Sequence, residues 1–246
     1  MRSLTLHRGS VYLFGKRFPV AVVAILAVTL LATLVGAVGL RSDFPLLAYV
    51  GLVPAAVWEG QLWRLFTWVF FVQGLTPISL LFLAIMLLVF GRDLCDAWGS
   101  RRFVLVYLGL AGAAGVLTCL IARAVGGLMM ANYLDCSPVI DGLVIAWALM
   151  FPTRQILFNF VIPVSGKSLI WITVGVTVFF ALLSGIGGYV PHLCALAAAY
   201  AYMRGTPFLR RQWVGARLRG REATTRRRPG HIRPVDEPPE KPRWYH

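Results

Sequence analysis

The chain alternates long apolar blocks with short polar or basic connectors. Six blocks carry almost no charge, and they cover residues 18–40, 76–91, 103–122, 138–152, 168–188 and 189–203. A helix that crosses a bilayer needs about 20 apolar residues, within a range of about 17–25. Four blocks reach that length once their flanks are included, whereas 138–152 and 189–203 are short and can cross only inside a bundle. The pattern predicts six membrane-spanning helices within residues 18–205.

The composition agrees with a membrane protein and excludes an ordinary soluble domain. Of the 246 residues, 58% are hydrophobic and 14% are charged, and the mean hydropathy is +0.72. A soluble globular domain has about 25% charged residues. The first block is too long for the apolar core of a signal peptide, and no small-x-small cleavage site follows it, so we expect it to be the first span. The predicted fold class is all-α, a polytopic six-helix bundle.

The distribution of basic residues predicts the orientation in the membrane. If both ends are cytoplasmic, the cytoplasmic side holds 21 of the 24 Lys and Arg residues, and the other side holds Arg41, Arg64 and Arg123. Cytoplasmic loops are rich in Lys and Arg, so this arrangement is the expected one. We therefore predict a cytoplasmic N-terminus (1–17) and a cytoplasmic C-terminus. The arginine- and alanine-rich composition indicates a bacterial inner (plasma) membrane.

The C-terminal tail, 206–246, is basic and becomes rich in proline toward its end. Residues 204–246 hold twelve Lys and Arg against four Asp and Glu. This composition predicts disorder. Each basic residue near a membrane surface contributes about 1 kcal/mol of attraction to anionic lipid, so the lipid bilayer is the expected partner of the tail. Nucleic acid is not expected, because the tail contains no folded recognition module.

A long segment, 41–73, separates the first two blocks. It contains two prolines, short apolar pieces and the aromatic residues Tyr49, Trp58, Trp63 and Trp68. Amphipathic rings settle at the membrane interface, which predicts an interfacial first loop. Connections of this length are often functional. The alternative is a surface loop that its aromatic residues anchor to the membrane.

Two runs of small residues predict close helix packing. Glycine recurs at every third position from Gly109 to Gly115. His192, Ala195 and Ala199 lie on one face of a helix, with the two alanines beneath the imidazole. Small residues at such spacings allow two helices to approach closely. We expect another helix to pack very near His192.

The four cysteines predict no special chemistry. They are Cys95, Cys119, Cys136 and Cys194, and none forms a CxxC pair. A lone cysteine in a span usually behaves as a small apolar residue. The sequence therefore predicts no metal site, no disulfide framework and no cofactor.

Few polar groups interrupt the spans, and four of them are Asp135, Ser137, Asp141 and His192. An ionisable residue within a membrane is a functional hypothesis by default. Ser137 and His192 each lie near the outer start of a predicted span, so both are expected at a similar depth. A serine becomes a nucleophile when an imidazole accepts its proton. The alternatives are a Ser-Pro helix start for Ser137 and a packed, hydrogen-bonded role for His192.

Residues 60–205 contain, in order, stretches that resemble the rhomboid family of intramembrane serine proteases. They are WRLFT, FGRDLCDAWGSRRFVLVYL, Ser137 with Gly142 five residues on, FPTRQI, IPV and PHLCALAAA. The last of these is similar to the histidine helix of the family, with alanine in place of both glycines. The resemblance implies a six-helix bundle, a catalytic Ser137–His192 pair, and cleavage of membrane-anchored substrates near the outer end of a span.

The sequence departs from the family at two motifs. The GxSG motif is replaced by Asp135-Cys136-Ser137-Pro138, and the HxxxN motif of the second span falls on Ser79 and Leu83. The HxxxN side chains help to hold the oxyanion, and loss of one oxyanion donor costs about 10²–10³ in rate. Backbone N–H groups around Ser137 remain. Ser79 and Asn132 are the candidate side-chain donors.

Asp141 occupies a position that is commonly aromatic in the family. It lies one helical turn after Ser137, on the same face. We hypothesise that Asp141 accepts a hydrogen bond from His192 and orients it, which gives a Ser-His-Asp arrangement. The alternative is a protonated Asp141 bonded to a backbone carbonyl, because burial favours the neutral carboxyl.

Three functions follow from these observations. The first is a rhomboid-type serine endopeptidase, whose substrates are transmembrane proteins. The second is a catalytically inactive rhomboid-like protein that binds or escorts transmembrane clients, which the altered GxSG and HxxxN motifs favour. The third, a channel or transporter, lacks the internal repeat or pair of broken helices that would indicate it. The retained Ser137 and His192 favour the endopeptidase.

Overall fold

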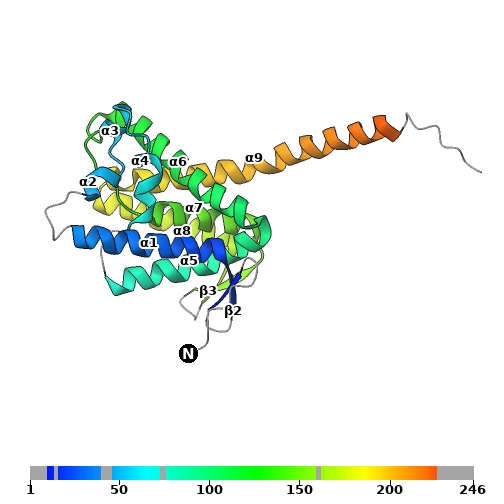
Figure 1. Ribbon diagram of the computed structural model, residues 1–246, viewed down its shortest axis with the longest axis horizontal. Helices are drawn as coiled ribbons and strands as arrows, with labels where there is room; N and C mark the ends of the chain where they lie inside the picture. Colours follow the sequence, from blue (N-terminus) through cyan, green and yellow to red (C-terminus); the bar gives the residue numbers. More distant parts are fainter. Residues whose placement is uncertain (1–9, 14–15, 40–45, 73–75, 159–161, 226–246) are drawn as a thin grey trace, which may run out of the picture. The chain divides into compact units, whose positions relative to one another are not determined.

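The computed structural model describes residues 10–13, 16–39, 46–72, 76–158 and 162–225, and from residue 206 onward it describes only the course of the last helix (Figure 1). In chain order the elements are β1 (Ser10–Leu13), β2 (Lys16–Pro19), α1 (Val20–Gly39), α2 (Leu46–Val50), α3 (Pro54–Trp58), α4 (Arg64–Thr67), the 3-10 helix η1 (Trp68–Phe70), α5 (Pro77–Trp98), α6 (Ser100–Val125), α7 (Ser137–Met150), β3 (Gln155–Phe158), β4 (Ile162–Ser165), α8 (Gly166–Ser184) and α9 (Ile186–Thr225). The predicted helical class is confirmed.

Among the described residues, four helices are long and apolar enough to cross a membrane: α1, α5, α6 and α8. The two short apolar blocks of the sequence correspond to α7 and to part of α9, which lie outside this group of four. The structure thus supports a multi-pass membrane protein, and it supports four of the six predicted spans by length and composition.

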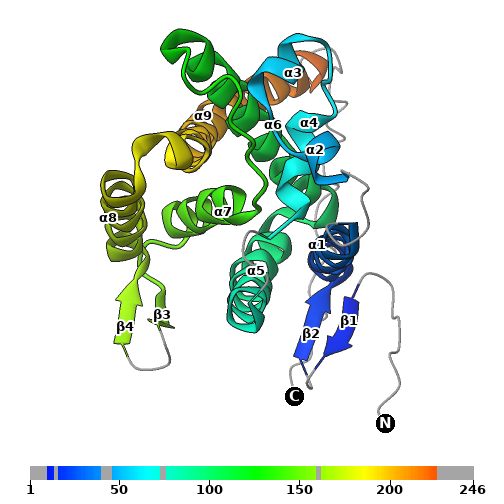
Figure 2. The same cartoon turned by 90° about the vertical axis from the view of Figure 1, so that its left-hand side faces the viewer.

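Helix α7 is short and buried on nearly all sides. It has 14 residues, which is about 21 Å of helix. Almost every side chain from Pro138 to Ala148 is buried. Figure 2 shows α7 between α5 and α8. A helix too short for lipid therefore lies inside the bundle, as expected from its sequence.

Two short hairpins were not predicted. β1 pairs with β2 and β3 pairs with β4, each as four residues in antiparallel register. Four-residue strands are too short for an alternating pattern to distinguish them from a loop. Both hairpins lie at the same end of the bundle, and α2, α3 and α4 lie at the opposite end (Figures 1 and 2). The two hairpins, β1–β2 and β3–β4, therefore lie on one side of the bundle.

Two predicted helix boundaries are corrected. The second span was expected to end at Gly91, but α5 continues to Trp98, because Arg92 pairs with Asp96 one turn on and Asp93 is bonded to Trp147 and Arg154. The fifth span was expected to end at residue 188, but α8 ends at Ser184. Gly185 has a φ of 96°, a left-handed conformation that glycine adopts at little cost. The chain turns there and α9 begins at Ile186.

Two glycines of α6, Gly112 and Gly115, face the first loop. A Cβ at Gly112 would lie 2.8 Å from the ring of Phe66, and one at Gly115 would lie 3.0 Å from Leu65. Gly109 has open space around it. The predicted close approach therefore occurs at Gly112 and Gly115, and its partner is the short helix α4.

The first loop folds into α2, α3, α4 and η1 around a buried arginine. Arg64 donates from Nη1 to the carbonyl oxygens of Ala48 and Gly51, each at 2.7 Å, and from Nε to Gln61 at 2.7 Å. A buried charge is tolerated when its donors are satisfied. The side chain of Trp68 is fully buried, whereas Tyr49, Trp58 and Trp63 are exposed. The loop is thus a folded cap, with three of its four predicted interfacial aromatics at the surface.

The chain divides into two compact units, residues 1–204 and residues 205–246. Helix α9 continues past residue 205 to Thr225, into the segment that the sequence predicts to be disordered. Five of the twenty residues from 206 to 225 are Arg, which is a good helix former. Residues 226–246, which include the proline-rich end, lie outside the described residues.

Candidate functional site

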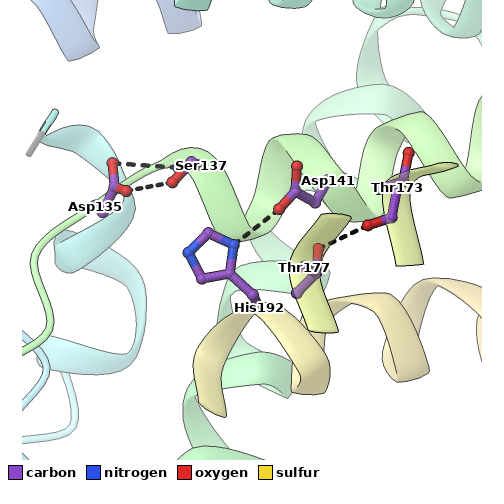
Figure 3. Close-up of polar contacts among 6 residues, drawn as sticks. All are labelled: Asp135, Ser137, Asp141, Thr173, Thr177 and His192. Atoms are coloured by element: carbon purple, nitrogen blue, oxygen red, sulfur yellow. Dashed lines mark hydrogen bonds and ion pairs between the residues drawn. The ribbon is translucent and has the colours of Figure 1, made fainter. Parts of the chain in front are cut away.

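The His192 ring is hydrogen-bonded to Asp141. Nδ1 of His192 lies 2.8 Å from Oδ2 of Asp141, and both side chains are mostly buried (Figure 3). The pairing lies within the hydrogen-bond reach that the orienting role of Asp141 requires. An imidazole that donates from Nδ1 has Nε2 free as a proton acceptor. The pair therefore presents Nε2 as the nitrogen that could serve as a base.

Small residues allow the two helices of this pair to approach. A Cβ at Gly142 of α7 would lie 3.3 Å from the carbonyl oxygen of Ala195 and 3.6 Å from the side chain of Ala199, both on α9. Ala195 and Ala199 are fully buried. Helix α7 thus packs against the face of α9 on which Ala195 and Ala199 lie beneath His192. The close approach brings Asp141 within reach of a short imidazole.

Ser137 is the first residue of α7, and its hydroxyl is bonded to Asp135. Both the hydroxyl and the backbone N–H of Ser137 donate to the Asp135 carboxylate, the N–H at 3.3 Å (Figure 3). The N–H contact lies at the first residue of α7, whose N-cap residue is Cys136. The hydroxyl contact was not expected. The hydrogen bond between Ser137 and His192 that an acting pair requires is not formed in this conformation of the described chain.

Two cavities meet at His192. The outer cavity has a volume of about 320 Å³ and is lined by Asn132, Asp135 and His192, together with Trp68 and Pro191. The lateral cavity has a volume of about 450 Å³ and lies between α5 and α8. Ser137, Asp141 and His192 all line the lateral cavity, so the three predicted site residues border one space.

The candidate oxyanion donors lie in different places. Ser79 belongs to the N-terminal cap of α5, where its hydroxyl donates to the carbonyl oxygen of Thr76 at 2.8 Å. Ser79 is not among the residues that line either cavity. Asn132 lines the outer cavity and lies against Gly51, where an added Cβ would come within 1.9 Å of its Oδ1. Of the two candidates, Asn132 is the one that shares a cavity with His192.

Tyr133 connects the segment before Ser137 to two other elements, and sequence reasoning missed it. Its backbone forms an antiparallel bridge with Leu52 of the first loop. Its hydroxyl donates to the carbonyl oxygen of Gly187 at 2.9 Å, at the start of the helix that carries His192. A tyrosine four residues before Ser137 gave no signal of this role, because its partners are distant in sequence.

Asp93 connects α5 to α7 at the opposite end of the bundle. Its Oδ2 accepts from Nε1 of Trp147 at 3.0 Å and from Nη1 of Arg154 at 2.8 Å. The ring of Phe151 stacks beneath the Arg154 guanidinium at 4.7 Å. This cluster joins α5 to α7 and to the segment that follows α7. It was also not predicted, although FGRD and FPTR were both noted in the sequence.

The cysteines take part in no disulfide among the described residues, and all four are buried. In the described part of the chain, no group of three or more His, Cys, Asp or Glu residues could hold a metal ion.

A bundle of long apolar helices with a polar cluster among them defines an integral, multi-pass membrane protein. The family model described as eukaryotic integral membrane protein (DUF1751) matches residues 20–224. The chain belongs to this family. No curated protein matches it. Because the family is described as eukaryotic, the expectation of a bacterial inner membrane receives no support from this match.

Proposed function

We propose that this protein is a rhomboid-type intramembrane serine endopeptidase that cleaves membrane-anchored substrates with Ser137 and His192. The observation that carries the proposal is the 2.8 Å contact between Nδ1 of His192 and Asp141. It supports an orienting role for Asp141, because a carboxylate on Nδ1 fixes the imidazole tautomer that accepts a proton at Nε2. The motif resemblance over residues 60–205 supports the reaction class.

The proposed reaction begins with a rotation of the Ser137 side chain. Its hydroxyl leaves Asp135 and donates to Nε2 of His192, which lines the same lateral cavity. His192 accepts the hydroxyl proton as Oγ attacks the scissile carbonyl, and then gives that proton to the leaving amine. Water hydrolyses the acyl-enzyme and restores the Ser137 hydroxyl. Asp141 accepts the hydrogen bond from Nδ1 and stabilises the imidazolium that forms.

Asn132 is the proposed side-chain donor to the oxyanion. It lines the outer cavity together with His192, and its position depends on the absence of a side chain at Gly51. Ser79 is the weaker candidate of the pair, since its hydroxyl is engaged in the cap of α5.

A second function is favoured by one observation, the hydrogen bond from the Ser137 hydroxyl to Asp135. A serine held by a carboxylate that is not its base is not poised for attack. In this alternative the protein is a catalytically inactive rhomboid-like protein that binds or escorts transmembrane clients.

We further propose that both termini face the cytoplasm, that residues 18–205 form the membrane domain, and that the basic tail from residue 206 attracts anionic lipid. The charge asymmetry supports the orientation, and the location of both hairpins at one end of the bundle is compatible with it.

The test is proteolysis in reconstituted vesicles. Wild type and Ser137→Ala would each be mixed with a library of single-span model proteins, and the products mapped by mass spectrometry. The proposal expects cleavage near the outer end of a span by wild type only. Equal capture of uncleaved spans by both proteins would instead support the client-binding function.

A further inference from the structure

The lateral cavity is mostly apolar, and its polar lining consists of Ser137, Asp141 and His192 together with Thr173, Thr177 and Tyr189. Its walls are formed by aliphatic and aromatic side chains of α5, α7 and α8. The hydroxyl of Thr177, which also borders it, already donates to the carbonyl oxygen of Thr173 at 2.8 Å. An apolar cavity does not hold water well. The shape therefore suits a ligand with an apolar body and one reactive polar end.

The cavity opens toward the bilayer. Phe82 on α5 and Val176 on α8 both line it, and about half of each side chain is exposed. In a helix long and apolar enough to cross the membrane, such exposed faces lie against lipid. Acyl chains are thus the molecules present at the opening.

The volume of the cavity selects among ligands. A spanning helix about 30 Å long and about 10 Å across occupies on the order of 2,000 Å³. The cavity offers about 450 Å³, in the range of sites for small molecules. A transmembrane segment enters only if α5 and α8 separate. A single acyl chain requires no such movement.

We propose that the lateral cavity binds one acyl chain of a membrane lipid and that Ser137 hydrolyses the carboxylic ester at the end of that chain. This activity rests on the proposed function, because it uses the same Ser137, His192 and Asp141. The ester carbonyl lies at the polar end of the cavity, and the alcohol portion extends toward the outer cavity.

The reaction balances with water as the only co-reactant. Oγ of Ser137 bonds to the ester carbonyl carbon while its proton passes to His192. The C–O bond to the alcohol breaks, and the alcohol leaves with the proton from His192. Water then attacks the acyl-enzyme, the bond to Oγ breaks, the fatty acid leaves, and Ser137 recovers its proton. An ester tolerates a sparse set of oxyanion donors better than an amide does, because its carbonyl is more electrophilic and its alcohol leaves more readily.

The test measures how fast two fluorophosphonates label Ser137 of the full-length protein in detergent. One probe carries a hexadecyl chain and the other an ethyl group. Val176→Phe fills the cavity from α8. Val178→Phe is the matched control, because Val178 lies on the same helix, is similarly exposed, and does not line the cavity. Val89→Phe fills the cavity from α5 and provides a second test of the cavity if Val176→Phe does not fold. Each probe partitions into the micelles equally in all samples. The ratio of labelling rates between two variants with the same probe is therefore independent of that partition.

We expect Val176→Phe and Val89→Phe to slow labelling by the hexadecyl probe about tenfold or more, which corresponds to loss of favourable chain burial. Labelling by the ethyl probe should change less than about twofold, and Val178→Phe should behave as wild type with both. Para-nitrophenyl hexadecanoate hydrolysis should follow the hexadecyl probe. Ethyl labelling of Ser137 with hexadecyl labelling unaffected by cavity filling would overturn the acyl site alone. No labelling of folded wild type by either probe would overturn the proposed serine nucleophile, and ester hydrolysis with it.

Discussion

Nδ1 of His192 lies 2.8 Å from Oδ2 of Asp141, across 51 residues of sequence and between two different helices. The contact depends on Gly142 and on the alanines of α9, which let the helices approach closely enough for the two short side chains to meet. A chance pairing of ionisable groups is rare within a membrane domain, where such groups usually serve function.

Asp141→Asn should slow fluorophosphonate labelling of Ser137 about a hundredfold or more. The amide has nearly the shape of the carboxylate, but it does not stabilise an imidazolium and it permits the wrong tautomer of His192. The control is Asp96→Asn, which removes an exposed carboxylate of α5 that pairs with Arg92. Labelling of Asp141→Asn at the wild-type rate would exclude an orienting role for Asp141.

Asp135→Asn should speed labelling of Ser137 two- to tenfold, an order-of-magnitude expectation from the loss of one hydrogen bond to a charged acceptor. The carboxylate holds the serine hydroxyl away from His192, so a weaker acceptor releases it. The rate of labelling at saturating probe measures the effect. If the folded variant were instead much slower than wild type, Asp135 would be part of the reaction rather than a restraint on it.

Gly51→Ala should destabilise the protein by about 1–3 kcal/mol, the typical cost of overpacking, because its Cβ would overlap the amide of Asn132. The same substitution in an Asn132→Ala background should cost much less, a coupling that a double-mutant cycle measures by thermal unfolding. Gly175→Ala on α8 is the control, since a Cβ there meets open space. Additive effects of Gly51→Ala and Asn132→Ala would show that the two residues do not contact.

Asn132→Ala alone separates a catalytic role from a packing role. If Asn132 donates to the oxyanion, its loss should lower the labelling rate about 10²–10³-fold while the thermal midpoint changes little. A fall in stability with an unchanged rate per folded molecule would reassign Asn132 to packing.

Asp93→Ala should lower stability more than Arg154→Ala. Loss of Asp93 leaves Nε1 of the buried Trp147 without its acceptor, which costs about 1–3 kcal/mol. Arg154 is more than half exposed, so its pairing contributes about 1 kcal/mol or less. Thermal unfolding in detergent measures both. Equal losses would assign the stability of this cluster to the ion pair.

The long helices were predictable because hydrophobic length is a strong signal in membrane proteins. The small-residue face from His192 to Ala199 was also informative, since it predicted the close neighbour that the structure identifies as α7. Helix ends were less predictable. The end of α8 depends on the conformation of Gly185. Helix α5 runs through charged residues, and the partners of one of them, Asp93, come from elsewhere in the fold.

For the candidate site, the sequence indicated the residue types and a similar depth for them. It did not indicate which neighbouring group each side chain forms a hydrogen bond with. Ser137 has both Asp135 and His192 within its surroundings, and a linear pattern does not tell which one its hydroxyl binds. Tyr133 and Asp93 were missed for a related reason. Each acts through hydrogen bonds to residues more than 50 positions away.

The central claim is that Ser137 is a nucleophile activated by His192. The most direct measurement is mass spectrometry of the Ser137 peptide after treatment of the folded, purified protein with a fluorophosphonate, beside Ser137→Ala and His192→Ala. A phosphonyl adduct on Ser137 is expected in wild type and in neither variant. An unmodified Ser137 in folded wild type, or an adduct that forms as fast in His192→Ala, would contradict the central claim.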